Sequence, residues 1–361
     1  MINNYSYSEK PKGYFSNARK VYSVLFALSA CTIGYILILQ YAYSVFCGLM
    51  SGKGLTDLGG YPIGHDFLAF WTATKLALTA DPSSIYNLEI LKTAEKAVSG
   101  TDSAYFAWNY PPTFLLFLLP LSGLPYLAAY CVWILGLLCG FVYIVHRISP
   151  RPFTPWLFMV LPPAIWNLIA GQNGSLSAAI LGSGIILLDR RPFTGGVVLG
   201  LLSYKPHLTA MIPIALIAGR YWRALLGFAI SGAVLVLISI AVFGTSVWNA
   251  FWQNVFFAFT HWQTVHFWPK MASVYALIRF TGAHAWIASI AQACVTISVA
   301  AIAYCVWRRA EGIAVKGSVL AICSLLASPY LFHGDMVIIG LAFAWLGNSE
   351  YDKEGNGILL L

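Results

Sequence analysis

Long apolar runs, separated by short polar stretches, make up most of this 361-residue chain. Full-length runs lie at 21–47, 126–145, 223–243 and 284–306. Shorter runs lie at about 153–170, 174–188, 193–204, 206–218, 317–331 and 335–346. A helix needs about 20 apolar residues to cross a bilayer, and the long runs meet that length. The pattern therefore predicts an all-α integral membrane protein that forms a single transmembrane domain over residues 1–361.

The longest polar stretch, residues 51–110, follows the first apolar run. Within it, apolar positions recur at helical spacing over 67–78. A second such segment covers 83–98, with Asp81 or Ser83 as its N-terminal cap. We expect both segments to be amphipathic helices that lie on the membrane surface.

The composition agrees with a chain that is solvated by lipid. Hydrophobic residues make up 59% of it and charged residues only 9%, whereas soluble proteins carry roughly 25% charged residues. The net charge of +8 does not indicate a nucleic-acid partner, because the basic residues recur as pairs between apolar runs and do not form one stripe. The seven cysteines have no Cys-x-x-Cys spacing and fit small core residues.

The basic pairs also orient the chain, because positive charges beside membrane spans stay on the cytoplasmic side. Arg190-Arg191 is one such pair. If each apolar run crosses once, and 113–121 is re-entrant or interfacial, the rule is satisfied by about ten spans with both termini cytoplasmic. The stretch 51–110 is then the first outer loop of a plasma (inner) membrane protein, and the polar residues near the outer ends of the spans form its active site.

Two predicted hairpins are too short to cross the bilayer twice. The hairpin 191–220 has Lys205 and His207 at its tip, and the hairpin 316–347 has Asp335 at its tip. Charged residues at membrane depth are tolerated only where protein or water surrounds them. We therefore expect both tips to end inside a polar cavity below the outer surface.

This topology collects a set of polar side chains on the outer side. They are His65, Asp66, Gln172, Asn173, Lys205, His207, His261, His266, Arg279, His333 and Asp335. Several have a purely structural interpretation as well: Asp66 and Asp335 could cap helices, and Gln172-Asn173-Gly174 could be a turn.

Lys205 is harder to explain, since a charge between apolar runs costs roughly 2.5–3.5 kcal/mol on insertion scales. It either pairs with Asp335 or binds an anion. His261 and His266 lie among tryptophans and fit interfacial anchoring. They would be about 140° apart around a helix, which is a poor arrangement for sharing a metal. We expect neither a metal nor a cofactor.

A carboxylate, buried cations and a layer of surface helices suit the transfer of a sugar from a lipid phosphate. Asp66 would take the proton from the acceptor hydroxyl, and Lys205 and Arg279 would hold the donor phosphate. The residues that would line the cavity are His65, Gln172, Asn173, His207, His333 and Asp335. A single displacement of this kind inverts the anomeric configuration. The sequence has no nucleotide-sugar domain and no Walker loop, so the donor would come from the bilayer.

Several short motifs also occur in a characteristic order. They are Gly64-x-Asp66-Phe67, Tyr110-Pro111-Pro112, Leu124-Pro125-Tyr126, Gly171-Gln172-Asn173, Lys205-Pro206, Ser273 with Arg279, and Ser328-Pro329-Tyr330 before Asp335. Over about 60–350 this order resembles glycosyltransferase family 87, the polyprenol-phosphate-mannose-dependent mannosyltransferase-like membrane proteins of the GT-C superfamily. The resemblance implies a GT-C-type polytopic helical fold and a catalytic acidic residue in the first outer loop, at Asp66. It also implies a polyprenyl-phosphate sugar as donor, often mannose and in relatives arabinofuranose, and a lipid or glycan as acceptor.

Two departures from the family pattern leave the sugar and the acceptor open. Met271-Ala272-Ser273 stands where Asn-x-Ser is usual, and His333-Gly334 stands where an acidic or aromatic pair is expected. Two other functions remain as alternatives. One is a flippase or transporter for polyprenyl-linked lipids, although the sequence lacks the matched broken segments of an inverted repeat. The other is a surface-polysaccharide ligase without Asp66-dependent transfer.

Overall fold

The computed structural model describes residues 12–102, 106, 108–151, 154–261, 271–309 and 312–354, and these residues form a helical bundle without β-strands. The first elements are α1 (Lys12–Met50), α2 (His65–Thr79), η1 (Pro82–Tyr86), α3 (Leu88–Ser99), η2 (Pro112–Phe114), α4 (Leu115–Leu118), η3 (Leu119–Leu121) and α5 (Tyr126–Ile148). The middle elements are α6 (Thr154–Met159), α7 (Pro162–Ala170), α8 (Gly174–Leu188), α9 (Pro192–Gly200), η4 (Leu201–Tyr204), α10 (Pro206–Thr209) and α11 (Met211–Ala218). The last are α12 (Trp222–Phe243), α13 (Ser246–His261), α14 (Val274–Phe280), α15 (Ala285–Arg308), α16 (Ile313–Leu326), η6 (His333–Ile338) and α17 (Ile339–Glu354).

Four of the described helices are long and apolar enough to cross a membrane. They are Leu28–Met50 within α1, and the whole of α5, α12 and α15. The four full-length apolar runs of the sequence are thus confirmed as helices. The shorter runs form helices of 10–17 residues at Gly174–Leu188, Pro192–Tyr204, Pro206–Ala218 and Ile313–Leu326. The count of about ten spans stays a prediction.

The outward faces of the long helices are apolar. Leu39 on α1, Leu237 on α12 and Ile297 on α15 are 68%, 64% and 70% exposed. Exposed apolar surface on this scale is unusual for a soluble monomer and marks a surface that something apolar covers. Together with the length of these helices, it supports association with a lipid bilayer.

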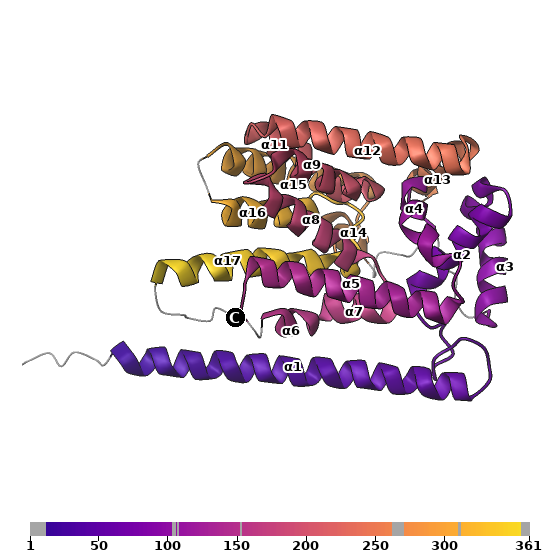
Figure 1. Cartoon of the computed structure of the whole chain (residues 1–361), viewed down its shortest axis with the longest axis horizontal. Helices are drawn as coiled ribbons and strands as arrows, with labels where there is room; N and C mark the ends of the chain where they lie inside the picture. Colours follow the sequence, from indigo (N-terminus) through magenta and orange to yellow (C-terminus); the bar gives the residue numbers. More distant parts are fainter. Residues whose placement is uncertain are drawn as a thin grey trace, which may run out of the picture.

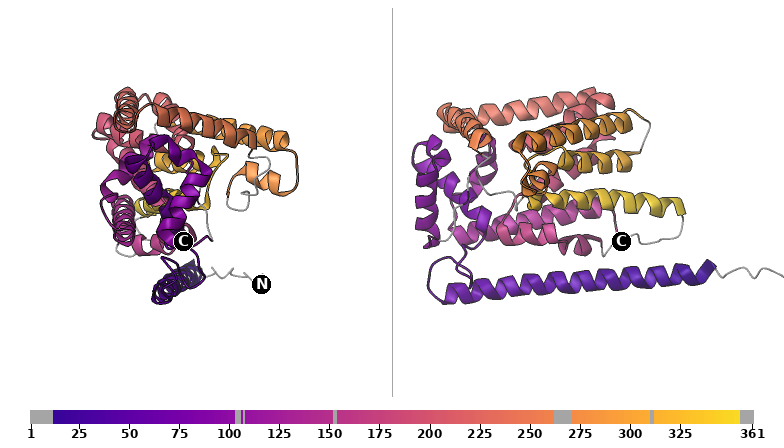
Figure 2. Two further views of the ribbon diagram at one scale, coloured as in Figure 1. Left: turned by 90° about the vertical axis from the view of Figure 1, so that its right-hand side faces the viewer. Right: turned by 180° about the vertical axis from the view of Figure 1, so that it is seen from behind.

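The axes of the long helices are roughly parallel, and the segment between α1 and α5 lies across one end of them. Helices α1, α5, α12 and α17 run along the long axis, whereas α2 and α3 run crosswise at the end where α12 leads into α13 (Figures 1 and 2). Within the bundle, helices α9 and α12 pack closely against each other. An added Cβ at Gly196 would lie only 1.9 Å from the carbonyl oxygen of Ala224, so only glycine permits this packing.

Helix α2 is less exposed than a membrane-surface helix would be. Its N-cap is Gly64, which has a left-handed φ of 75°, and an added Cβ there would lie 2.8 Å from the ring of Tyr130. Phe67 and Phe70 are buried, and they pack against aromatic residues of the α4–α5 region such as Trp133. The expectation of a helix over 67–78 is confirmed, but much of its surface is covered by protein.

The single helix expected over 83–98 is wrong, because the segment breaks at Asn87. Its first part is the short helix η1, and Asp81 caps it by accepting a hydrogen bond from Ser83 N. Asn87 is extended, and its side chain accepts hydrogen bonds from Glu89 N and Ile90 N at the start of α3. An asparagine side chain that bonds forward to the next backbone amides starts a new helix and does not continue an old one.

The run at 153–170 is likewise divided into α6 and α7. Pro162 and Pro163 stand at the start of α7. A proline lacks the N–H that would bond to the preceding turn, so it is tolerated at a helix start and breaks a helix interior.

Candidate functional site

Asp66 is the second residue of α2, and it faces the turn between α7 and α8. Gln172 Nε2 donates a hydrogen bond of 2.9 Å to Asp66 Oδ2. The turn is held close to α2 by Gly171, whose φ is 65° and whose added Cβ would lie 2.5 Å from the Cβ of Phe67. Trp133 Nε1 donates to the Gly171 carbonyl at 2.8 Å. The carboxylate and the amide are therefore both positioned by packed backbone.

The cap position of α2 belongs to Gly64, so Asp66 lies within the first turn. The positive end of the helix dipole favours an ionised carboxylate at this place. Asp66 is partly exposed.

Lys205 forms a buried ion pair with Asp335. The distance between Lys205 Nζ and Asp335 Oδ1 is 2.5 Å, and both side chains are almost completely buried. Of the two explanations that the sequence left open for Lys205, pairing with Asp335 is therefore observed. Lys205 Nζ also lies 5.9 Å from the centre of the Tyr110 ring, which adds a cation–π contact. The pair joins the turn between η4 and α10 to η6.

His207 reaches the same carboxylate from the start of α10. Its Nε2 lies 3.8 Å from Asp335 Oδ2, which is too long for a hydrogen bond. This nitrogen is buried and has no hydrogen-bond partner among the described residues.

The α7–α8 turn connects Asp66 with the Lys205–Asp335 pair. Asn167 Nδ2 donates to the Gly334 carbonyl at 2.6 Å, and an added Cβ at Gly334 would lie 3.3 Å from Gln172 Cγ. Gln172 therefore touches Asp66 on one side and the backbone beside Asp335 on the other. The structure thus brings the first turn of α2 close to the turns that carry Lys205 and Asp335. That these residues form the functional site stays a prediction.

Asn173 is completely buried beside Gln172. Its Oδ1 accepts a hydrogen bond of 3.4 Å from the hydroxyl of Tyr110, and its backbone carbonyl accepts one of 3.2 Å from Ser177 Oγ. Its Nδ2 has no hydrogen-bond partner among the described residues. An amide donor that is buried without a hydrogen-bond partner costs free energy, so Asn173 Nδ2 is a position where a ligand oxygen could accept a hydrogen bond.

Aromatic rings pack around His65, the residue before Asp66. His65 stacks on Phe106 with ring centres 6.0 Å apart and an angle of 11° between the planes. Trp166 lies edge-on to His65 at 6.0 Å and to His333 at 4.6 Å. The predicted lining residues His65 and His333 are thus linked through the indole of Trp166, which the sequence analysis did not single out.

Arg279 lies near the end of α14, where its Nη1 donates to the Ala283 carbonyl at 2.8 Å. The segment before α14 pairs with the segment before η6, since Ala272 N donates to the Leu331 carbonyl at 2.7 Å. Whether Arg279 meets Lys205 at one phosphate stays a prediction. His266 and the side chain of His261 lie outside the described residues.

Glu95 on α3 is a carboxylate that the sequence analysis missed. It is completely buried, and its Oε2 accepts a hydrogen bond of 3.1 Å from Phe106 N. Burial raises the pKa of the Glu95 carboxyl to about 8, the bond from Phe106 opposes that rise, and the charge of Asp66 adds to it. Its position offered a signal, because Glu95 falls four residues from both Leu91 and Ser99 on the buried face of α3.

Within the described ranges, no group of three or more His, Cys, Asp or Glu side chains could hold a metal ion. The polar groups that meet at the site are the carboxylates of Asp66 and Asp335, the ammonium of Lys205, amides and imidazoles. This set can accept a proton and donate hydrogen bonds to oxygen atoms.

The model of glycosyltransferase family 87 matches residues 108–329 of the chain. The matched range includes Tyr110, Gln172, Asn173, Lys205 and Arg279, and it excludes Asp66 and Asp335. No curated protein and no solved structure matches the chain.

Proposed function

The chain belongs to glycosyltransferase family 87, and from that premise we propose that it uses a polyprenyl-phosphate sugar as donor. The sugar, mannose or another hexose or pentose, passes to a hydroxyl of a lipid or glycan acceptor on the outer face of the plasma (inner) membrane. The proposal includes a GT-C-type fold with about ten spans, with both termini cytoplasmic, and requires no metal or other cofactor.

One observation supports this proposal. Gln172 contacts the partly exposed carboxylate of Asp66 and also the segment of Asp335, and Asp335 is paired with the buried Lys205. Gln172 Nε2 donates to Asp66 Oδ2 at 2.9 Å, and its side chain packs against Gly334, next to Asp335. A proton acceptor and a cation thus share one site beside apolar helices. A cation stabilises the departing phosphate, and a proton acceptor activates the attacking hydroxyl.

The proposed step is a single displacement. Asp66 takes the proton of the acceptor hydroxyl as its oxygen forms a bond to the anomeric carbon of the donor. The bond from that carbon to the phosphate oxygen breaks, and its electron pair leaves with the polyprenyl phosphate. The new glycosidic bond has the opposite anomeric configuration, and Asp66 later loses its proton to water.

Lys205 contributes to the departure of the phosphate although it is paired. An ammonium has three N–H donors, and the carboxylate of Asp335 receives one of them. Asn173 Nδ2 and His207 Nε2 are buried without hydrogen-bond partners among the described residues, and they supply further polar atoms for phosphate or sugar oxygens. Arg279 is proposed as a second cation for the same phosphate.

The test follows a radioactive sugar in proteoliposomes. Polyprenyl phosphate that carries [3H]mannose or [14C]arabinose is supplied with lipid and glycan extracted from membranes that lack this protein. A transferase moves the label into a new glycoside and releases polyprenyl phosphate. Label that only changes leaflet would support the flippase, and label that moves with a whole polysaccharide would support the ligase; either result would contradict the proposal.

A further inference from the structure

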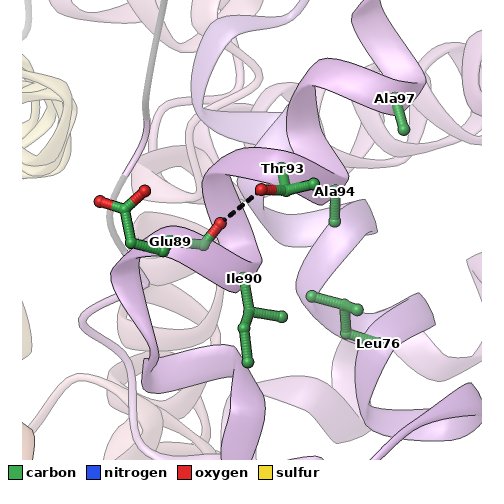
Figure 3. Close-up of a pocket in the computed structure, with 6 residues that line it drawn as sticks. All are labelled: Leu76, Glu89, Ile90, Thr93, Ala94 and Ala97. Atoms are coloured by element: carbon green, nitrogen blue, oxygen red, sulfur yellow. Dashed lines mark hydrogen bonds between the residues drawn. The ribbon is translucent and has the colours of Figure 1, made fainter.

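Helix α3 carries two glutamates in opposite environments. Glu89 is exposed and stands at the rim of an apolar groove that Leu76 of α2 lines together with residues of α3, as Figure 3 shows. Glu95 follows six residues later, about 240° further around the helix, and is completely buried. Only Glu89 therefore behaves as an ordinary residue of a water-exposed helix face.

Burial leaves one oxygen of Glu95 without compensation. Oε2 accepts a hydrogen bond from Phe106 N, whereas Oε1 is buried and has no hydrogen-bond partner among the described residues. A buried carboxylate with an uncompensated oxygen costs folding free energy. Since a glutamine would accept the same hydrogen bond from Phe106 N without an ionisable carboxyl, that bond alone does not explain the choice of glutamate.

Glu95 reaches Asp66 through two contacts. It holds the backbone of Phe106, and the ring of Phe106 stacks on His65, the residue before Asp66. His65 has a φ of 28°, a value at which a residue other than glycine is strained unless its surroundings hold it. The bond from Phe106 to Glu95 is therefore part of what holds the first turn of α2 in place.

Glu95 also lies within the electrostatic reach of Asp66, which is the charged side chain that acts on it. The other titratable or charged groups on α3 and on the segments packed against it are Lys53, Asp57, Tyr61, His65, Lys75, Asp81, Tyr86, Glu89, Lys92, Lys96 and Asp102. Among them, Lys96 is paired with Asp102 at 2.8 Å on the exposed side, and Lys75 lies over the ring of Trp71. Tyr126 of α5 also lies within the electrostatic reach of Glu95.

We propose that Glu95 is a positioning residue for the catalytic base: it fixes Phe106 and His65 around Asp66, and its ionisation strengthens Asp66 as a base. This inference rests on the proposed function of Asp66. In its neutral form, Glu95 accepts the hydrogen bond from Phe106 and adds no charge. In its ionised form, it places a second negative charge near Asp66, which raises the proton affinity of that carboxylate.

The experiment compares the pH dependence of label transfer from polyprenyl phosphate in four proteins. The wild type should become about threefold faster as the pH rises through about 8, in keeping with Brønsted behaviour. Glu95→Gln keeps an acceptor for Phe106 N–H but cannot ionise, so its rate at pH 6.5 should stay within about twofold of the wild type and the rise should vanish. Glu95→Ala should be about tenfold slower at every pH.

The matched control is Glu89→Gln, which makes the same chemical change on the exposed face of α3 and should keep the wild-type profile. A Glu95→Gln protein that still accelerates through pH 8, or a Glu95→Ala protein with wild-type rates, would overturn the inference. The melting temperature against pH separates this failure from failure of the proposed function. Even without label transfer, it should fall between pH 7 and 9 in the wild type and stay level in Glu95→Gln.

Discussion

Asp66 and Asp335 are two carboxylates of one site, and they are held in different ways. Asp66 is partly exposed in the first turn of α2 and accepts a hydrogen bond from the neutral amide of Gln172 at 2.9 Å. Asp335 is buried in η6 and paired with Lys205 at 2.5 Å. An ammonium at that distance stabilises the negative form and makes protonation unfavourable, whereas a neutral amide orients a carboxylate without removing its basicity. Under the proposed function, this difference favours Asp66 for the proton transfer and leaves Asp335 to hold Lys205.

The largest expected effect comes from breaking the buried pair. Lys205→Met leaves the carboxylate of Asp335 buried without its cation, and loss of one partner of such a pair costs about 3–5 kcal/mol. We expect poor recovery of folded protein in detergent and a much lower melting temperature.

The double variant Lys205→Met with Asp335→Leu is the control for this prediction. It removes both charges, so the protein should melt near the wild-type temperature while label transfer stays low. A single Lys205→Met variant that melts like the wild type would show that Asp335 does not depend on Lys205.

The next effect concerns Glu95, whose contribution to the free energy of unfolding decreases as the pH rises. Because the pKa of Glu95 rises from 4.5 to about 8 in the folded protein, its contribution to stability is complete below pH 4.5 and is lost as the pH rises through 8. The wild type should lose about 2–4 kcal/mol from this group between pH 5 and 9. Glu95→Gln should lack that loss, and melting curves in detergent over this range would measure it. Equal pH dependence in both proteins would contradict the prediction.

Gln172 offers a smaller change, which removes the hydrogen bond to Asp66. Gln172→Ala removes the hydrogen bond that orients the carboxylate, and we expect transfer to fall about tenfold, or about 1.4 kcal/mol, with little change in melting temperature. Gln172→Glu sets a like charge against Asp66 and should fall further. If both variants transfer at the wild-type rate, Gln172 does not position the base.

The smallest effect concerns the stability of α3 and should leave the rate of transfer nearly unchanged. Asn87→Ala removes the side chain that caps α3 by accepting from Glu89 N and Ile90 N, which should cost about 1 kcal/mol. The melting temperature should fall slightly, while the rate of transfer stays within about twofold of the wild type. A large loss of transfer would mean that α3 moves Asp66 when its first turn loosens.

The sequence predicted the helical class and the membrane character because long apolar runs are typical of helices that cross a bilayer. It placed Lys205 and Asp335 at the tips of two short hairpins, and the structure shows that they pair, whereas the predicted approach of Arg279 to Lys205 stays a prediction. It did not predict the break at Asn87, because a local side-chain bond there outweighs a continuous apolar pattern. The burial of α2 was missed for another reason: its cover comes from residues such as Trp133, which are distant in sequence.

Glu95 was missed because a single glutamate in an amphipathic helix is normally solvated. Its burial is accompanied by a hydrogen bond from Phe106 N, a contact that no periodicity reveals. Trp166 was missed likewise, since one tryptophan in an apolar run is typical of any membrane helix. Trp166 became visible through its contact with His65, and Glu95 through its burial and its hydrogen bond from Phe106 N.

The central claim, that Asp66 is the base, is tested most directly by the rate of label transfer in Asp66→Asn under single-turnover conditions. Asp81→Asn serves as the control, because it makes the same change at an exposed cap of the same loop. We expect Asp66→Asn to melt near the wild-type temperature and to transfer at least about a hundredfold more slowly, as loss of a general base requires, while Asp81→Asn transfers normally. An Asp66→Asn protein that keeps more than about a tenth of the wild-type rate would contradict the account.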